Sequence, residues 1–161
     1  MNRHLFILNP AAGKKDRTEK LRALIEKLRI NEPYDIFVTD SVGSAEITTE
    51  NYLKNHLQEC VRVYSCGGDG TLYEVANGVY RSAHTDCAIA IVPVGSGNDF
   101  VKSLDIPTEN FKSLRALLKG TTVEVDLLLA RDEDGVERVS LNIISAGFDG
   151  TVRKYSIPSH K

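Results

Sequence analysis

The sequence predicts an α/β fold, a Rossmann-like three-layer parallel sheet with helices on both faces, followed by the first strands of a truncated antiparallel β domain. Two observations carry this prediction. Segments with helical periodicity alternate with short, continuously apolar segments over the first 120 residues, which is typical of a parallel sheet buried on both faces. Beyond residue 121, two strand-like segments are joined by a polar turn that contains glycine, which indicates an antiparallel hairpin.

Two strand and helix units are predicted at the start of the chain. Residues 5–8 are continuously apolar and end in the turn at residues 9–13, which indicates a buried strand. Apolar side chains at helical spacing within residues 16–29, with Lys and Glu between them, predict an amphipathic helix. The same pattern repeats as a strand at residues 34–39 and a helix at residues 44–57.

The alternation continues through the middle of the chain. Residues 61–65 predict a third strand. The helix that begins at Thr71 is expected to end at Gly78, because glycine suits the position just after a helix C-terminus. Residues 87–94 form another continuously apolar segment and predict a fourth strand, and residues 111–119 predict one more helix.

The last segment of the chain predicts a second structural unit. Residues 123–130 and 136–145 have strand character, and the turn at residues 132–135 joins them. We therefore expect an α/β domain at residues 1–120 and the start of a β domain at residues 121–161, truncated because no further strands follow to bury the first two. Unpaired strand edges recruit partners, so self-association as a homodimer is also expected.

Composition limits the class of protein. With 161 residues and 42% hydrophobic side chains, the chain is long enough for one domain with a buried core. The formal net charge of −2 offers no basic surface for nucleic acid or for an anionic membrane, so we expect no nucleic acid partner. Three cysteines without CxxC spacing indicate reduced thiols and a cytoplasmic protein. No segment approaches the roughly 18 apolar residues of a membrane span, so any membrane contact would be peripheral.

The most informative motif is the turn Cys66-Gly67-Gly68-Asp69-Gly70-Thr71, which follows the third predicted strand. Its glycines leave backbone N–H groups uncovered, so an anion can lie against the main chain at the start of the next helix. A carboxylate beside a phosphate is favourable chiefly when Mg²⁺ lies between them, so Asp69 indicates a metal nucleotide. The alternative is an ordinary strand-to-helix turn in which Asp69 is the N-cap.

Two further turns follow predicted strands. Residues 9–13 follow the first strand, and residues 95–99, Gly-Ser-Gly-Asn-Asp, follow the fourth. Because the carboxyl ends of parallel strands share one edge of a sheet, all three turns are expected to meet at one ligand site. The sequence has no GxxxxGK[ST] motif and its four histidines lack metal-ligand spacing, which argues against a P-loop enzyme and a zinc site.

Polar groups at these turns are suited to phosphate. The backbone N–H groups of Gly68 to Thr71, with the hydroxyls of Thr71 and Ser96, would hold phosphates. Asn9 would offer its amide to a phosphate or a ribose, or else serves only its own turn.

Five other polar residues are candidates with open alternatives. Thr39, at the end of the second predicted strand, would reach the nucleoside. Glu74 and Asn77 lie one helical step apart and would orient the ligand, or else are surface residues. Asn98 either caps the next helix or contacts ligand. Asp126 lies within an apolar strand, where an unpaired carboxylate is costly, so it is either a hydrogen-bonded structural residue or one linked to metal or catalysis.

The three turns together resemble the diacylglycerol kinase catalytic domain. The matching segments are residues 9–13 (Asn-Pro-Ala-Ala-Gly), 67–78 (Gly-Gly-Asp-Gly-Thr-Leu-Tyr-Glu-Val-Ala-Asn-Gly) and 93–100 (Pro-Val-Gly-Ser-Gly-Asn-Asp-Phe). This family includes sphingosine and ceramide kinases and is related to NAD kinases and phosphofructokinases through the Gly-Gly-Asp-Gly motif, whereas the third segment resembles the lipid kinase signature. The resemblance implies transfer of the γ-phosphoryl group of ATP, with Mg²⁺, to a lipid hydroxyl such as that of diacylglycerol at a membrane surface.

The resemblance also implies an ATP-binding domain at residues 1–120 and the start of a lipid-binding β domain at residues 121–161. Asp69 is then a catalytic and metal-binding candidate, and Asp126, which would match the aspartate that closes the first domain, is a second catalytic candidate. The residue pattern and the resemblance together give the nucleotide-binding candidates Asn9, Gly13, Thr39, Gly67, Gly68, Asp69, Gly70, Thr71, Glu74, Asn77, Gly95, Ser96 and Asn98. In the family, the acidic residue thought to deprotonate the acceptor lies in the second half of the polypeptide, so turnover by this chain alone stays open. The alternatives are an NAD kinase-like enzyme and a nucleotide-binding module without turnover.

Overall fold

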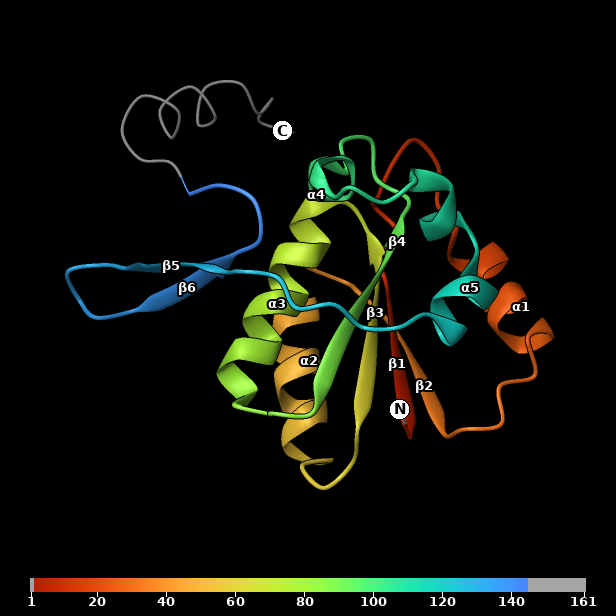
Figure 1. The fold of residues 1–161 in the computed structure, drawn as a ribbon, viewed down its shortest axis with the longest axis horizontal. Helices are drawn as coiled ribbons and strands as arrows, with labels where there is room; N and C mark the ends of the chain where they lie inside the picture. Colours follow the sequence, from red (N-terminus) through yellow and green to blue (C-terminus); the bar gives the residue numbers. More distant parts are fainter. Residues whose placement is uncertain (1, 145–161) are drawn as a thin grey trace.

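Four parallel strands form the central sheet of the computed structural model, which describes residues 2–144. The strands are β1 (Arg3–Leu8), β2 (Tyr34–Val38), β3 (Val61–Gly67) and β4 (Cys87–Pro93), in the spatial order β2-β1-β3-β4 (Figure 1). All three neighbouring pairs are parallel. The predicted parallel sheet is therefore confirmed.

Helices cover both faces of this sheet. Helices α1 (Thr18–Lys27) and α5 (Leu114–Lys119) lie on one side, and α2 (Ser44–Lys54) and α3 (Asp69–Ser82) lie on the other (Figure 1). Because successive strand residues point to opposite faces, β1 divides its apolar side chains between two cores. The core under α1 and α5 contains Phe6, Leu8, Ile25, Tyr64, Cys66, Ala90, Val92 and Leu114, and the core under α2 and α3 contains Leu5, Ile7, Ala45, Leu53, Val61, Val63 and Val75.

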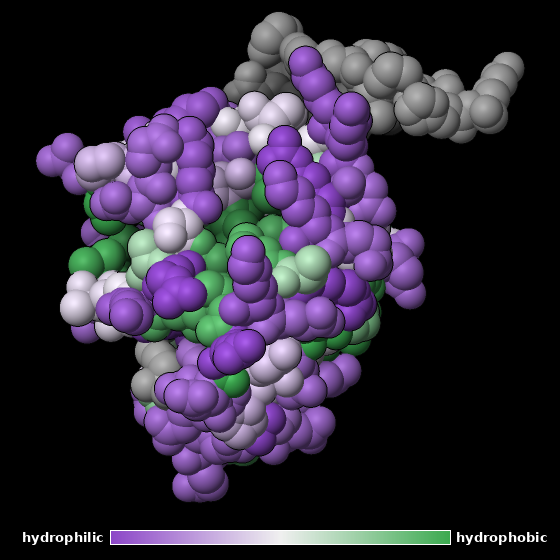
Figure 2. Space-filling model, turned by 90° about the vertical axis from the view of Figure 1, so that its right-hand side faces the viewer, coloured by the Kyte–Doolittle hydropathy of each residue, from purple (hydrophilic) through white to green (hydrophobic). Residues whose placement is uncertain are grey.

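The cover on the α1 and α5 side is the thinner one. Figure 2 looks onto this side and shows hydrophobic side chains gathered at the centre of the face, with hydrophilic side chains around them. Several apolar side chains of this layer are only partly buried, among them Leu21, Tyr34 and Leu117. Helix α5 has only six residues. Its C-terminal carbonyls are bound by Arg62 of β3, whose guanidinium donates to Leu117, to Leu118 and, at 3.0 Å, to Gly120.

Gly78 does not end helix α3, as the sequence predicts, but lies inside it, because α3 continues to Ser82. A Cβ at Gly78 would lie 2.5 Å from the carbonyl oxygen of Glu46 and 2.7 Å from Cβ of Thr49, both on α2. The missing side chain therefore lets two helices approach closely. The residue after the helix that adopts the left-handed conformation is Ala83, with φ of 54°.

The chain after β4 differs in detail from the predicted elements. Two short helices, α4 (Asp99–Ser103) and the 3-10 helix η1 (Thr108–Lys112), precede α5. The single helix predicted at 111–119 is split, because η1 ends at Lys112 and α5 begins at Leu114. The antiparallel hairpin is present as β5 (Leu128–Arg131) and β6 (Glu137–Ser140), and it forms a sheet of its own. Both strands are shorter than predicted. The end of the second predicted strand, residue 145, lies outside the described residues.

The structure of residues 2–144 bears on two sequence-based expectations, that the cysteines are reduced and that no segment spans a membrane. None of the three cysteines forms a disulfide bond within the described residues, and Cys66 is buried while the other two are partly buried. Burial raises the pKa of the Cys66 thiol, and mainly burial raises that of Cys87 to about 12. In this part of the chain, we find no helix with both the length and the apolar character needed to cross a membrane.

Candidate functional site

The site lies where the strand order reverses direction. From β1, the chain passes through α1 to β2 on one side, whereas β3 lies on the other side of β1. The helices after β1 and β3 therefore leave toward opposite faces, which opens a crevice at the carboxyl ends of these two strands. The turns that begin at Asn9 and Gly67 both lie at this point.

Asn9 and Thr71 join the two turns. The Asn9 side-chain amide donates to Thr71 Oγ1 at 2.9 Å, and Asn9 Oδ1 accepts from the Ala11 N–H at 2.9 Å. Asn9 thus holds its own turn and links it to the start of α3. Because Thr71 Oγ1 accepts this bond, the hydroxyl hydrogen is available for a ligand.

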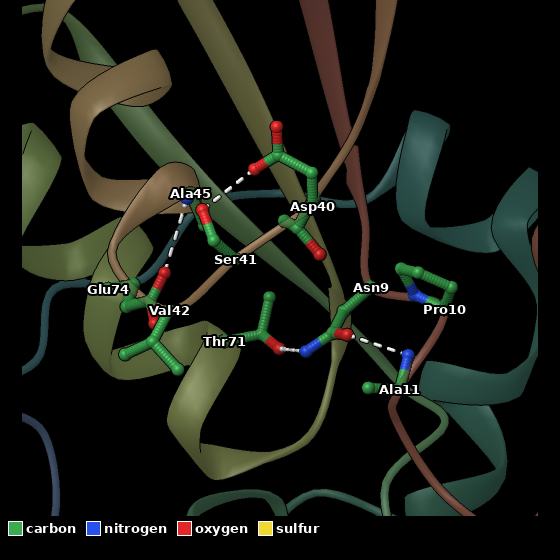
Figure 3. Close-up of a pocket in the computed structure, with 10 residues that line it drawn as sticks. Asn9, Pro10, Ala11, Asp40, Ser41, Val42, Ala45, Thr71 and Glu74 are labelled. Carbon is green, nitrogen blue, oxygen red and sulfur yellow. Dashed lines mark hydrogen bonds between the residues drawn. The ribbon is translucent and has the colours of Figure 1, made fainter.

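A pocket of about 270 Å³ opens beside this pair (Figure 3). It is bounded by the turns after β1 and β2 and by the first turns of α2 and α3. The residues that line it are Asn9, Pro10, Ala11, Thr39, Asp40, Ser41, Val42, Ala45, Thr71 and Glu74. Four predicted nucleotide-binding residues, Asn9, Thr39, Thr71 and Glu74, therefore surround one hollow.

Glu74 ties the far wall of this pocket to α3. Its Oε2 accepts from the Ala45 N–H at 3.2 Å, in the first turn of α2 (Figure 3). The first N–H groups of a helix have no partner within the helix, so Glu74 supplies one from outside. Thr39 is likewise held by the main chain, since its N–H donates to the Leu8 carbonyl at 2.9 Å. Both residues are parts of a fixed wall.

The turns after β3 and β4 pack directly on each other. A Cβ at Gly95 would overlap the Cα of Gly68, and Gly67 O accepts from the Val94 and Gly95 N–H groups at 3.0 and 3.2 Å. The first turn joins this cluster as well, because a Cβ at Gly13 would overlap the Val94 carbonyl. The tertiary structure therefore brings all three predicted turns together at one edge of the sheet.

Asp69 lies between two helix starts. It is the first residue of α3, and its Oδ1 accepts from the Phe100 N–H of α4 at 3.3 Å. Its Oδ2 faces Gly97, where a Cβ would lie 2.8 Å from Asp69 Oδ2 and 3.7 Å from Asp99 Oδ2. Within the part of the chain that the structure describes, no group of three or more metal-ligating side chains occurs. The Asp69 and Asp99 carboxylates both lie close to Gly97, and Mg²⁺ is commonly held by one or two carboxylates together with phosphate and water.

Other predicted residues have different positions. Ser96 is exposed on the Gly95–Asn98 loop. Asn98 donates to the Gly95 carbonyl at 2.7 Å, with φ of 54°, so its amide closes this loop instead of capping α4. Asn77 is fully buried, and its amide binds the main chain of β6 at Val139. Its amide is therefore engaged away from the pocket.

Asp126 has an environment opposite to the one predicted. It is exposed and lies in the extended segment between α5 and β5, outside any strand. The premise that this carboxylate is buried and needs a partner was wrong, because the apolar residues around it are themselves exposed, with Val125 and Leu127 both at 46%.

Sequence reasoning missed part of the pocket wall. Asp40, Ser41, Val42 and Ala45 line the pocket but carry no recognisable motif. Only their position could have identified them, because they follow β2 at the same sheet edge as the glycine turns.

A second, shallow hollow of about 510 Å³ lies beside the first turn. It is lined by Asp16 and by four exposed basic residues, Lys14, Lys15, Arg17 and Lys20.

The chain is similar in sequence and in fold to proteins of one family. The family model described as "Diacylglycerol kinase catalytic domain" matches residues 3–130. Proteins named diacylglycerol kinase from Staphylococcus aureus (strain bovine RF122 / ET3-1) and Staphylococcus carnosus (strain TM300) are each 29% identical over 123 residues, or 76% of this chain. The chain spans only 38% and 39% of their respective lengths. A crystal structure of a diacylglycerol kinase from Bacillus anthracis str. Sterne superimposes with a TM-score of 0.59 and 27% identity, over 78% of this chain and 45% of that one.

Proposed function

The chain belongs to the diacylglycerol kinase catalytic domain family, and from that premise we propose that it is the nucleotide-binding part of an ATP-dependent lipid kinase. The reaction would move the γ-phosphoryl group of ATP to the hydroxyl oxygen of a lipid alcohol of the diacylglycerol type. The proton of that hydroxyl would pass to a base, and ADP would leave.

One observation carries the proposal. Three turns at the carboxyl ends of β1, β3 and β4 converge through the Asn9–Thr71 bond and the Gly68–Gly95 contact. The pocket bounded by the turns after β1 and β2 opens beside this convergence and would take the nucleoside, and the bare N-terminus of α3 suits phosphate. Phosphoryl transfer needs mainly positioning and charge neutralisation, and this arrangement supports both.

Each part of the site has a distinct role in the proposal. The uncapped N–H groups at the start of α3, from Asp69 to Thr71, would donate to phosphate oxygens. The Thr71 hydroxyl, oriented by Asn9, would donate a further bond. Asp69, with Asp99 nearby, would hold Mg²⁺, which would neutralise charge on the phosphate oxygens. Thr39 and Glu74 would bound the nucleoside.

Transfer of label from γ-labelled ATP tests this function. Protein, Mg²⁺ and diacylglycerol in mixed micelles should give labelled lipid that partitions into organic solvent, and Asp69→Ala should abolish it. A parallel reaction with NAD separates the related soluble-acceptor kinases, because labelled NAD phosphate without labelled lipid would contradict the lipid assignment.

One alternative is a nucleotide-binding module without turnover, because the pocket lies wholly within the described residues of the α/β domain. Mg²⁺-dependent ADP binding by calorimetry, together with no label in any acceptor, would support the module.

The partner predictions extend the proposal. Residues 121–161 would begin the lipid-facing unit, and the exposed Lys14, Lys15, Arg17 and Lys20 lie at the ligand edge, where a membrane surface would approach. Cosedimentation with vesicles with and without anionic lipid tests this peripheral contact. The outer edge of β5 has no partner strand among residues 2–144, which supports homodimerisation. Light scattering that gives the monomer mass across a wide concentration range would contradict the dimer.

A further inference from the structure

Asn77 is the most completely engaged side chain between the α/β layers and the hairpin. It lies in the third turn of α3 and has no exposed surface. Its Nδ2 donates to the Val139 carbonyl at 2.9 Å and to the Tyr73 carbonyl at 2.9 Å, while its Oδ1 accepts from the Val139 N–H at 3.0 Å. The amide group therefore binds both backbone groups of one β6 residue, as a neighbouring strand would.

The hydrogen bonding of the hairpin explains why this contact is specific. Val139 is paired in register with Leu129 of β5, yet both its N–H and its carbonyl are bound by Asn77. The two groups therefore point to the outer edge of β6. In antiparallel pairs, only every second residue points its backbone groups outward, so shifting β6 by one residue would present to Asn77 a residue whose N–H and carbonyl point toward β5 instead. The amide thus fixes the register of β6 on α3.

Exposed contacts around Asn77 are weaker. Arg138 donates to Glu46 Oε1 of α2 at 2.6 Å, and Tyr80 donates to Glu137 Oε2 at 2.5 Å. The Arg138 and Glu46 side chains are 39% and 13% exposed, so this ion pair is partly open to solvent, and ion pairs open to solvent contribute little to stability. A buried amide left without partners costs far more. Asn77 is therefore the main polar link between α3 and the hairpin.

We propose that Asn77 is a positioning residue, whose buried amide holds hairpin β5–β6 at a fixed register on α3 and thereby at a fixed distance from the glycine turn. Helix α3 begins at Asp69, eight residues before Asn77, which corresponds to about 12 Å of helix. The same helix thus carries the phosphate-facing turn at one end and the hairpin on its side. We call the Asn77–Val139 contact the clamp. This step rests on the proposed function: the clamp would hold the acceptor-side unit, which residues 121–161 would begin, at a fixed distance from the phosphates.

Amide hydrogen exchange of the full chain, resolved by residue, tests the clamp without any kinase assay. In Asn77→Ala, protection of the Val139 amide should fall at least about tenfold, while amides of β3 keep wild-type protection. Arg138→Ala, which removes only the exposed ion pair, should leave Val139 protected. Unchanged Val139 protection in Asn77→Ala would overturn the proposal, as would an equal loss in β3 and in the hairpin, because the latter would make Asn77 a general core residue.

Asn77→Leu provides a second test, because leucine has the same branched shape as asparagine but no hydrogen-bonding atoms. Its side chain cannot accept from the Val139 N–H, so protection of Val139 should fall as in Asn77→Ala. Wild-type protection of Val139 in this variant would contradict the clamp, even where the alanine variant fails to fold.

Kinetics separate the clamp from the proposed reaction. In the label-transfer assay, Asn77→Ala should lower kcat at least about tenfold with KM for ATP within about twofold, because the pocket itself is unchanged. Loss of protection at Val139 with normal kcat would remove the catalytic part of the proposal. If the wild-type chain transfers no label, the proposed function fails on its own, and the exchange result still decides the clamp.

Discussion

Gly95 packs directly against Gly68. A Cβ at Gly95 would overlap the Gly68 Cα, and a Cβ at Gly68 would lie 3.3 Å from the Gly95 Cα. The obstructing atoms are backbone atoms, which cannot turn aside as a flexible side chain would. The contact joins the turn after β4 to the turn after β3, so the shape of the site depends on two glycines that are distant in sequence.

Gly95→Ala should therefore lower both stability and nucleotide binding. The added methyl must push the two turns apart, and overpacking of this kind costs about 1–3 kcal/mol. Urea denaturation measures the stability, and calorimetry with Mg²⁺ and ADP measures the affinity. Wild-type values for both would show that the turns separate without cost.

Gly70→Ala should weaken nucleotide binding without lowering stability. No atom lies within 4 Å of a Cβ at this position, and Gly70 is in the first turn of α3. Alanine is favoured over glycine in helices by up to about 1 kcal/mol, so the urea midpoint should stay the same or rise. Because a helical Cβ tilts toward the helix N-terminus, the methyl would enter the space proposed for phosphate.

The affinity of Gly70→Ala for ADP should fall at least about tenfold, a loss of about 1.4 kcal/mol. Gly95→Ala provides the comparison, since it should lose stability as well. A Gly70→Ala protein that binds ADP like the wild type would exclude close approach of phosphate to this turn.

Gly78→Ala should destabilise the protein although it improves helix propensity. The methyl would lie 2.5 Å from the Glu46 carbonyl oxygen and 2.7 Å from Thr49 Cβ, so α2 and α3 must separate. We expect a lower thermal midpoint, with overpacking of about 1–3 kcal/mol outweighing the propensity gain.

Ala83→Gly is the matched control for the same helix. Ala83 has φ of 54° after the last turn of α3, where glycine avoids a steric cost of about 1–2 kcal/mol. This variant should raise the thermal midpoint. If Gly78→Ala were also stabilising, close packing of α2 on α3 would not be the reason for the glycine.

Stability should fall in mildly acidic solution because of His4. The side chain is buried, and burial is the main cause that lowers the pKa of His4. Its Nδ1 lies 3.3 Å from the Tyr64 hydroxyl oxygen. Since the folded-state pKa is below the unfolded value of about 6.5, the unfolded chain takes up the proton first. The stability that the neutral, buried His4 side chain contributes to the fold is complete above about pH 6.5 and is lost progressively as pH falls below that value.

Urea midpoints between about pH 8 and pH 5 measure this loss, in a window above the titration of ordinary carboxyl groups. His4→Gln should have a flatter profile because it cannot titrate. An identical slope in this variant would assign the pH dependence to other groups.

The strands of the parallel sheet and the three turns were predictable from sequence because their signals are local. A continuous apolar segment such as 61–65 identifies a strand buried on both faces, and glycines just after it identify a turn. Parallel connectivity then requires the turns to share one edge. The fold class and the convergence of Gly13, Gly68 and Gly95 followed from these rules.

The sequence by itself therefore determined the α/β class, the four strands and the family motifs, whereas tertiary structure decided the roles of individual polar and glycine residues. Gly78 looked like a helix stop, but its function is to admit α2. The sequence left Asn77 open between a ligand contact and a surface position, and only the tertiary structure shows that its amide binds Val139, 62 residues away. Asp126 looked buried, but the segment around it is exposed. Propensity and spacing depend on neighbours along the chain, while burial and hydrogen-bond partners depend on which elements pack together.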